Sequence, residues 1–351
     1  MQKDKDQYCI TFEHIEKALQ RVKGTVCRTP LLKGPSSMNV QGKELYFKVE
    51  AMQHTGSFKF RGAINAIKAQ IEQNTAPKPL CIVTHSSGNH AQALALAAKL
   101  CDTEECPVKP ATIVMPRGAP QVKQEATRSY GGEVILCDNS NEARQEKANL
   151  IVSERGASFI HPSENPFVIA GQGTISLEII EQFKDFGLNA PDAIIIPVGG
   201  GGLASGNAVA LRALFSDKIK IILAEPKVLD DAKRSFDCGQ HVKHDPDNKL
   251  DSVADGLKTT LGPNTWPIVR DLVDDIFTVS EEDILHATKQ TWEQLKVCIE
   301  PSAGVGVAVA LGKEFNSKYS SDKGIVNVAV ILCGGNVDIL KTTKKMEQLG
   351  L

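Results

Sequence analysis

The sequence predicts an α/β protein in which mostly parallel sheets are covered by helices. Short apolar runs rich in β-branched residues recur along the chain, and helical patterns separate most of them. The runs are "LCIVTHS", "ATIVMP", "GEVILCD", "ASFIHPS", "DAIIIPV", "IKIILAE" and "NVAVILC", and the helical patterns include "NHAQALALAAKL" and "LASGNAVALRALF". Ligands of such folds bind outside the carboxyl ends of the strands, so the residues that follow each strand are the candidates for a site.

Composition narrows the class of partner. At 351 residues the chain is long enough for about two domains. Forty basic and forty-two acidic residues give a net charge of −2 without any lysine-arginine block, so neither nucleic acid nor membrane is expected as a partner. The N-terminus "MQKDKDQYCITFEHIEKALQ" is charged and unlike a signal peptide, and no apolar run is long enough to cross a bilayer. We expect a soluble, cytoplasmic protein.

Cysteine usage agrees with a reducing compartment. The nine cysteines are scattered, odd in number and partly inside apolar runs, which favours free thiols over a disulfide framework. Cys101 and Cys106 lie close together in sequence, but no histidine pair accompanies them at metal-binding spacing. A zinc site is therefore not expected there.

The first candidate site follows "LCIVTH", where "SSGNHAQALA" opens a helix. Free N–H groups at a helix start, with the positive end of the helix dipole, suit an anion such as a carboxylate. The alternative is an ordinary helix start capped by Ser86 or Ser87. A cap accounts for one serine, but not for Gly88, Asn89 and His90 together.

The second candidate site follows "DAIIIPV", where Gly199–Gly202 open another helix. Successive glycines allow backbone N–H groups to close around a phosphate. A flexible loop is one alternative. Another is a dinucleotide-binding fingerprint, because Gly199, Gly201 and Ala204 fit it loosely and Glu225 ends the next strand where a ribose-binding acid belongs. The glycine run alone does not choose between a nicotinamide cofactor and a smaller phosphorylated one.

The third candidate site is the end of "NVAVILCGGN", where Cys333 precedes two glycines and Asn336. This pattern allows close approach of a flat or phosphorylated ligand, although a double glycine can also simply form a tight turn.

The stretch "GSFKFRGA" adds a lysine, Lys59, between a serine-glycine turn and phenylalanines at the start of a helical pattern. A solvated lysine is the ordinary interpretation. Pyridoxal phosphate, however, needs a lysine for its Schiff base, a phosphate-binding loop and a partner for its ring nitrogen, and the candidate sites together supply all three. We expect apolar surroundings to lower the pKa of Lys59 and make its amine the better nucleophile.

An ordered set of motifs resembles the serine racemase and serine/threonine dehydratase group of fold-type II pyridoxal phosphate enzymes, from about Tyr8 to Asp338. The motifs are "GSFKFRGA", "THSSGNHAQAL", "HPSENPFVIAGQGT", "PVGGGGL", "VADGLKT", "GPNTWPIVRDLVDDIFTVSEE", "IEPSAGVGVA" and "CGGNVD". The resemblance implies a fold like that of the tryptophan synthase β chain. It also implies a large domain of residues 1–80 and 163–351, with a small α/β domain of residues 81–162 inserted, and a homodimer. The cofactor would lie in the cleft between the domains.

The resemblance also implies roles for individual residues. Lys59 would hold the cofactor and, once freed, act as the base on one face of the substrate Cα, while Ser87 would stand on the other face. Asn89 would contact the cofactor's phenolic oxygen, and Phe58 would pack beside the lysine. The implied cofactor-binding residues are Phe58, Lys59, Asn89, Gly199, Gly200, Gly201, Gly202 and Cys333. The implied substrate-binding residues are Ser86, Ser87, Gly88, Asn89, His90 and Arg144.

Cys333 departs from the family pattern, which usually has serine at this position. A thiol is a weak hydrogen-bond partner, and like serine it does not keep a pyridine nitrogen protonated as a carboxylate would. We expect fixed dipoles, the lysine ammonium and concerted proton transfer to carry more of the stabilisation of the carbanion. Glu300, in "IEPSAG", is the nearby carboxylate that the motif set suggests, without an assigned role.

Ser87 decides between two expected activities. Racemisation and elimination both begin with loss of the α-proton, but only a racemase needs an acid opposite the lysine. Threonine dehydratases tend to have alanine where this chain has Ser87. We therefore expect interconversion of L-serine and D-serine, with elimination of serine to pyruvate and ammonia. The alternatives are a serine/threonine dehydratase without racemisation, and a dinucleotide-dependent oxidoreductase or catalytically silent ligand-binding relative.

Two further sites are implied by the resemblance. Glu225, Asp231 and the carbonyl of Leu229 match positions where the family binds a divalent cation, and such oxygen ligands suit Mg²⁺, Ca²⁺ or Mn²⁺. Positions that line a nucleotide site between subunits are matched by Thr55, Gln92, Tyr130, Lys296 and Asn336. His54 stands where that site usually has lysine, so ATP is expected at most as an allosteric activator. The polar stretch 237–256 is predicted to be a long surface loop.

Overall fold

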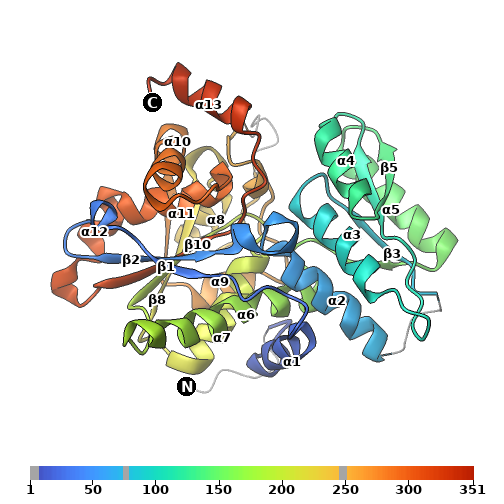
Figure 1. Cartoon of the computed structure of the whole chain (residues 1–351), viewed down its shortest axis with the longest axis horizontal. Helices are drawn as coiled ribbons and strands as arrows, with labels where there is room; N and C mark the ends of the chain where they lie inside the picture. The colour runs from blue at the N-terminus through green and yellow to red at the C-terminus, as the bar shows by residue number, and fades with distance from the viewer. Residues whose placement is uncertain (1–7, 74–78, 245–250) are drawn as a thin grey trace.

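The computed structural model describes residues 8–73, 79–244 and 251–351. It contains two sheets, each flanked by helices (Figure 1). Within the described residues, no helix is long and apolar enough to span a bilayer.

The larger sheet has six strands in the order β1-β2-β10-β7-β8-β9. Their bounds are β1 (Leu31–Lys33), β2 (Glu44–Val49), β10 (Asn327–Leu332), β7 (Ala193–Pro197), β8 (Lys220–Pro226) and β9 (Asp275–Val279). β1 pairs with β2 in antiparallel fashion, and every other pair in this sheet is parallel. The sheet therefore joins strands from both ends of the chain, and the carboxyl ends of its parallel strands share one edge.

The smaller sheet has four parallel strands in the order β5-β4-β3-β6. Their bounds are β5 (Glu133–Cys137), β4 (Thr112–Pro116), β3 (Ile82–His85) and β6 (Ser158–Phe159). All four lie within 81–162, and we keep the division into a small inserted domain of these residues and a large domain of 1–80 and 163–351 as a proposal.

The helices cover both faces of each sheet. In Figure 1, α10 (Glu281–Gln290) and α11 (Pro301–Leu311) lie above the larger sheet, and α6 (Pro166–Phe183) and α7 (Gly202–Phe215) lie below it. The remaining helices are α1 (Phe12–Val22), α2 (Lys59–Gln73), α3 (Asn89–Cys101), α4 (Gln121–Ser129), α5 (Asn141–Arg155), α8 (Asp231–Cys238), α9 (Trp266–Leu272), α12 (Lys313–Lys318) and α13 (Ile339–Gln348). α3, α4 and α5 pack on the smaller sheet.

Burial explains the strand sequences. Every residue of β7, "AIIIP", is buried, as expected for a parallel strand with helices on both faces. α6 begins where Asn165 caps it, with Pro166 in its first turn, and packs closely on α7. A Cβ at Gly206 would lie 2.2 Å from the carbonyl oxygen of Ile169, so this close packing requires glycine.

The seven strands predicted from the sequence are confirmed, and β1, β2 and β9 were not predicted. The predicted loop 237–256 begins inside α8, which continues to Cys238, and its residues 245–250 lie outside the described part of the chain. All nine cysteines are free thiols, as expected.

Candidate active site

Lys59 is the first residue of α2, and the segment before it is held against the end of β10. Phe58 N–H donates to the carbonyl of Cys333 (3.1 Å), and Gly335 N–H donates to the carbonyl of Gly56 (2.9 Å). Ser57 and Gly334 form an isolated antiparallel bridge. Backbone hydrogen bonds therefore hold the predicted sites around Lys59 and Cys333 side by side.

The amine of Lys59 lies in a half-buried position and donates to the carbonyl of Pro162 (2.9 Å). It also lies 5.0 Å from the centre of the Phe58 ring. Burial lowers the pKa of Lys59 to about 8, against the opposing influence of Cys333 and Glu300. The expected lowering by desolvation is confirmed, and a substantial fraction of the amine is neutral near physiological pH.

The glycine run lies beside the residue that follows Pro162. A Cβ at Gly200 would lie 2.5 Å from Ser163 Oγ, and a Cβ at Gly202 would lie 2.9 Å from the carbonyl oxygen of Ser163. Gly201 has a φ of 81°, which disfavours any other residue. α7 begins at Gly202, so free N–H groups of a helix start face this loop. Glycine is thus required at these positions, and the loop suits a phosphate.

His161 holds the turn that carries Pro162 and Ser163. Burial lowers the pKa of His161 to about 4, so its neutral ring can accept hydrogen bonds. Its Nδ1 accepts the backbone N–H groups of Ser163 (3.2 Å) and Glu164 (3.0 Å). The carbonyl that contacts Lys59 is therefore fixed by a ring in the same turn.

Glu164 connects this turn to the glycine loop. Its Oε1 accepts from Thr265 Oγ1 (2.9 Å), which also lies 3.1 Å from the carbonyl of Gly200. Its Oε2 accepts the backbone N–H of Asn264 (2.8 Å). Lys59 and the glycine loop thus share one supporting turn.

The loop between β3 and α3 contains the predicted carboxylate site. The alternative interpretation, a helix start capped by Ser86 or Ser87, is wrong, because Gly88 is the N-cap of α3 and no side chain caps the helix. Ser86 Oγ instead accepts the N–H of Gly88 within the loop (3.3 Å), and Ser87 is half-buried. An uncapped helix start leaves its N–H groups for a ligand.

His90 contributes its backbone to this loop, since its ring lies elsewhere. His90 is buried and its Nε2 lies 3.3 Å from the carbonyl of Ile160. Burial, and then the charge of Lys59, lower its pKa well below the usual value, so the ring is neutral.

Arg144 lies on α5, half-buried, with its Nε 3.4 Å from the carbonyl of Ser140. Its charge acts on the pKa of His85, the residue before Ser86, together with the larger effect of burial. The contact described for Arg144 lies at the start of α5 and not at Ser86–His90.

An amide-carboxyl network crosses the site. Asn89 Nδ2 donates to Glu300 Oε1 (2.9 Å), and Asn336 Nδ2 donates to Asn89 Oδ1 (2.9 Å) and to the carbonyl of Thr55 (2.7 Å). Asn89 keeps a second N–H hydrogen for a ligand. The network joins α3, the start of α11 and the segment after β10, so the first and third predicted strand-end sites face each other.

At physiological pH the carboxyl of Glu300 is mostly protonated and the thiol of Cys333 is neutral. Burial, followed by the charge of Asp255, raises the pKa of Glu300 to about 8. Burial, followed by Glu300, raises the pKa of the Cys333 thiol well above its usual value. A neutral thiol at this strand end is a weak hydrogen-bond partner, as the sequence suggested.

We predict that Glu300→Gln removes a pH dependence of stability. The pKa of Glu300 is raised from 4.5 to about 8 on folding. Its contribution to the free energy of unfolding is therefore fully present below pH 4.5 and is lost as the pH rises to 8. Glutamine mimics the neutral acid, so the variant should not show this loss. Thermal melts of the cofactor-free protein from pH 4.5 to 8 would measure it, with the exposed Glu314→Gln as control. An unchanged pH profile in Glu300→Gln would contradict the prediction.

The candidate metal ligands lie at the end of β8. Glu225 is buried, and its two carboxyl oxygens accept the N–H groups of Ala232 and Lys233 (2.9 Å each). Burial raises the pKa of Asp231 to about 7, and burial with the charge of Asp231 raises that of Glu225 well above normal. A bound cation would offset the cost of burying these two carboxyl groups in their charged form. No group of three or more histidine, cysteine or acidic side chains is assembled for a metal within the described residues.

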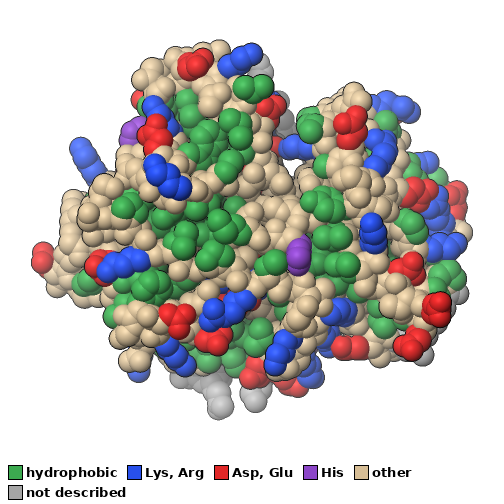
Figure 2. Space-filling view, in the orientation of Figure 1, with side chains coloured by type: hydrophobic (Ala, Val, Ile, Leu, Met, Phe, Trp, Pro, Cys, Tyr) green, Lys and Arg blue, Asp and Glu red, His purple; other side chains and the backbone are tan. Residues whose placement is uncertain are grey.

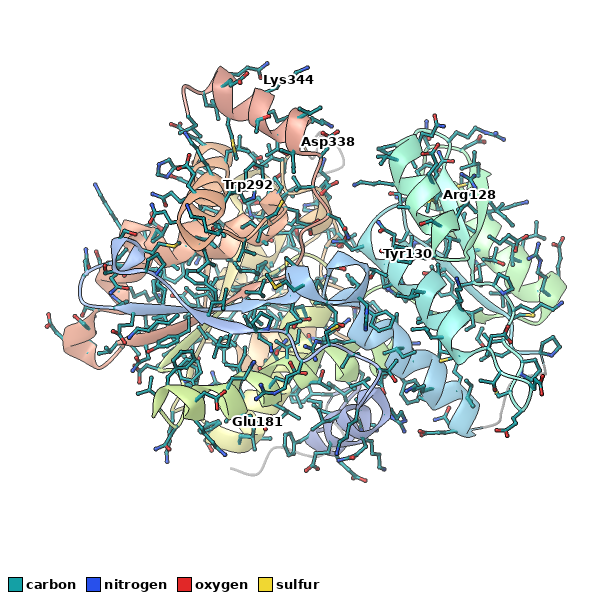
Figure 3. The ribbon with its side chains drawn as sticks, in the orientation of Figure 1. Arg128, Tyr130, Glu181, Trp292, Asp338 and Lys344 are labelled. Carbon is teal, nitrogen blue, oxygen red and sulfur yellow. The ribbon has the colours of Figure 1, made fainter. Side chains whose placement is uncertain are left out.

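The candidate nucleotide residues are spread over several elements. Thr55, with a left-handed φ of 60°, is joined to Asn336, as described above. Gln92 is buried on α3, whereas Lys296 is exposed with a φ of 61° after a π-helical turn. Figure 3 places Tyr130, at the end of α4, on the side of the smaller unit that faces the larger one.

Sequence reasoning missed the central role of the turn 161–164. The motif "HPSENPF" was part of the resemblance, but a backbone carbonyl that accepts from Lys59 has no residue-type signal. Thr265 and Leu257, which contact or closely approach the glycine run, were also missed, because only the fold brings them beside it.

Comparison with known proteins assigns the family. Residues 22–334 match the pyridoxal-phosphate dependent enzyme family. The chain belongs to this family, so the dinucleotide interpretation of the glycine run is wrong. The groups required by such a cofactor, an amine, a side-chain-free phosphate loop and a small strand-end residue, are all present in the described site.

Individual relatives are similar over nearly their full length. The chain is 43% identical to serine racemase from Rattus norvegicus over 335 residues, which cover 95% of each chain. It superposes on the structure of maize serine racemase with a TM-score of 0.86 and 41% identity, covering 97% of this chain and 98% of the other. A threonine deaminase from Solanum lycopersicum gives a TM-score of 0.82 at 32% identity, covering 97% of this chain and 93% of the other. The predicted fold-type II class is confirmed.

Proposed function

We propose that the protein interconverts L-serine and D-serine with pyridoxal 5′-phosphate as its cofactor and also eliminates serine to pyruvate and ammonia. The supporting observation is the position of the Lys59 amine, which donates to the carbonyl of Pro162 and has a pKa lowered to about 8. Ser163, the residue after Pro162, lies against the glycine run. The similarity to serine racemases over 95% of the chain, and to a threonine deaminase, supports both activities.

The residues that would hold the cofactor come from the strand ends of the larger sheet and from α3. Gly199–Gly202 would bind its phosphate, Asn89 its phenolic oxygen and Cys333 its ring nitrogen, with Phe58 beside it. When bound, pyridoxal phosphate withdraws electrons from the amino acid and makes the α-proton acidic. Because Cys333 is a neutral thiol, fixed dipoles and the Lys59 ammonium carry more of the charge stabilisation.

Proton transfer in this proposal uses two side chains. The neutral amine of Lys59 takes the α-proton from one face, and the carbonyl of Pro162 orients it. The hydroxyl of Ser87 gives a proton to the other face. The N–H groups of Ser86–His90 hold the substrate carboxylate, and Arg144 on α5 adds positive charge near this loop.

Incubation with L-serine and chiral chromatography test the activity. D-serine together with pyruvate supports the proposal. Pyruvate alone would indicate the alternative, a serine/threonine dehydratase without racemisation. The absence of both products would refute both enzymatic functions.

Ser87→Ala separates the two proton-transfer steps. We predict that it lowers D-serine formation by about 100-fold while L-serine elimination falls less than about tenfold, because only racemisation needs an acid on the second face. Ser86→Ala is the matched control: its hydroxyl accepts the N–H of Gly88, so its loss should reduce both activities by similar factors. Equal losses in Ser87→Ala would contradict the two-base scheme.

We further propose Mg²⁺, or Ca²⁺ or Mn²⁺, at Glu225, Asp231 and the Leu229 carbonyl, and ATP as an allosteric activator at Thr55, Gln92, Tyr130, Lys296 and Asn336. Two buried carboxyl groups with raised pKa values support a cation there. Repeating the chiral assay with and without magnesium and ATP tests both ligands. Unchanged rates would contradict activation.

A cytoplasmic homodimer is the proposed form of the protein. Hydrophobic side chains gather on the face of the larger unit in Figure 2. Exposed apolar residues include Met52 (52%), Ile339 (51%) and Leu340 (76%), which a second copy could cover. Sedimentation of the purified protein at twice the monomer mass would support this, and a monomer mass would refute it.

A further inference from the structure

A thiol–imidazole pair lies outside the proposed active site, next to Thr55 of the proposed nucleotide site. Cys27 Sγ lies 3.4 Å from His54 Nε2. Cys27 is half-buried on the segment between α1 and β1, and His54 is exposed at the start of a 3₁₀ turn, His54–Gly56, that precedes α2. An imidazole at this distance can accept the proton of the thiol and return it to a leaving group.

Six of the other eight thiols of the chain are less suited to reaction. Burial raises the pKa of Cys9 and of Cys101 to about 11, and it also raises the pKa of Cys137, Cys298 and Cys333. Cys238 is exposed, but its described contacts are backbone carbonyls of Ser235 and Gln240. Among described contacts between cysteines and other side chains, only that of Cys27 brings a base to the sulfur.

The backbone of Cys27 is anchored to the segment that leads to Lys59. Gln53 Oε1 accepts the N–H of Cys27 (3.0 Å) and that of His54 (3.0 Å), and Gln53 Nε2 donates to the carbonyl of Cys27 (2.8 Å). One glutamine side chain therefore holds both partners of the pair. A bulky group on the sulfur would lie against the His54 ring, which this glutamine holds in place.

The His54 ring in turn contacts the residue next to Lys59. Its centre lies 5.1 Å from that of the buried Phe60, edge to face. Thr55, the residue after His54, is in the left-handed conformation. Its carbonyl accepts from Asn336, which also donates to Asn89. Movement of His54 is thus coupled by direct contacts to the start of α2 and to the amide network of the site.

We propose that Cys27 is a site of reversible mixed-disulfide formation with a small disulfide such as glutathione disulfide, assisted by His54, and that this modification loosens the segment leading to Lys59. The Cys27 sulfur attacks one sulfur of glutathione disulfide, the S–S bond of the reagent breaks, and Cys27–S–S–glutathione forms. Cys27 is oxidised and the released glutathione half is reduced. His54 takes the thiol proton and transfers it to the released glutathione thiolate.

The site is tested by incubating the purified full-length protein with glutathione disulfide and mapping modified peptides by mass spectrometry over time. Cys27 should be modified before the exposed Cys238. His54→Asn should slow modification of Cys27 at least about tenfold and leave Cys238 unchanged, because it removes the base but keeps a polar side chain. Equal rates at the two cysteines, or an unchanged rate in His54→Asn, would overturn the proposal.

The coupling is tested without an activity assay. Hydrogen exchange of a peptide that covers residues 53–60 should rise on modification and return after dithiothreitol, and Cys27→Ser should abolish the response while Cys238→Ser keeps it. No change in exchange in a protein modified at Cys27 would overturn the coupling. The effect on catalysis rests on the proposed function, and a severalfold, dithiothreitol-reversible loss of serine conversion is expected. Because mapping and exchange need no turnover, their failure is distinguishable from failure of the racemase proposal.

Discussion

Lys59→Ala is expected to lower kcat/KM for both racemisation and elimination at least about 10³-fold. The variant loses the amine that would bind the cofactor covalently and that would take the α-proton. Purified wild-type protein should be yellow from lysine-bound pyridoxal phosphate, and the variant should lack this absorbance. Spectra of the purified proteins and chiral chromatography measure the two effects.

Lys68→Ala is the matched control for Lys59→Ala. Lys68 lies on the same helix, α2, and its amine donates to the carbonyl of Arg21 (2.8 Å) and to Thr25 Oγ1 (2.7 Å), away from the strand-end site. It should keep both the colour and the activity. Retention of colour and turnover by Lys59→Ala would refute the role of this amine.

The chemistry of Lys59 also predicts a pH dependence. Its pKa is lowered by burial from 10.5 to about 8, so the amine of the cofactor-free protein should react with an amine reagent at half its maximal rate near pH 8. Burial of the charged amine lowers the free energy of unfolding below pH 8, and this loss is recovered as the pH rises from 8 to 10.5. The pH range does not overlap that of Glu300, which runs from 4.5 to about 8. Peptide mapping of the labelled amine measures the titration, and a midpoint near 10.5 would contradict burial of the charge.

Strand-end reasoning found the residues of the site because parallel strands place their carboxyl ends at one edge. It located Asn89 and Cys333, whereas Lys59 was found from the motif "GSFKFRGA". It did not find Pro162 or His161, because their contribution is a backbone carbonyl and a ring that fixes a turn. Such contacts arise only when the end of the smaller sheet is brought against α2.

β2 shows why some elements were not predicted. Its sequence, "ELYFKV", contains Lys48, and a charge within an apolar run argues against a buried strand. The lysine is nevertheless fully buried, because its amine donates to Glu178 Oε2 (2.7 Å), Gln182 Oε1 (2.8 Å) and the carbonyl of Thr29 (2.7 Å). Two of these partners come from residues more than a hundred positions away, so no local pattern reports them.

Arg61→Met is expected to destabilise the protein by about 3–5 kcal/mol. Arg61, two residues after Lys59, is fully buried and bonds both oxygens of Glu50 (2.8 Å each) and both oxygens of Glu178 (2.7 and 2.8 Å). With Lys48, the cluster has two positive and two negative groups, so its charges balance. Methionine fills similar space but leaves one buried negative charge without a partner. Chemical denaturation at pH 7 measures the loss.

Arg155→Met is the control, because Arg155 makes a similar two-oxygen contact with Glu133 while both side chains are about 40% exposed. Its cost should stay below about 1 kcal/mol.

The difference between wild type and Arg61→Met should also depend on pH. Burial alone would raise the pKa of Glu178, but hydrogen bonds and charge from Arg61, and then from Lys48, hold it below 4.5. The stability from this group is present above pH 4.5 and is lost as the pH falls below it. In Arg61→Met the carboxyl of Glu178 can take up a proton at a higher pH, which removes the unpaired charge. The cost of the substitution should therefore shrink below pH 4.5, and a cost that grows with acidity would show that Arg61 acts through packing rather than through its charge.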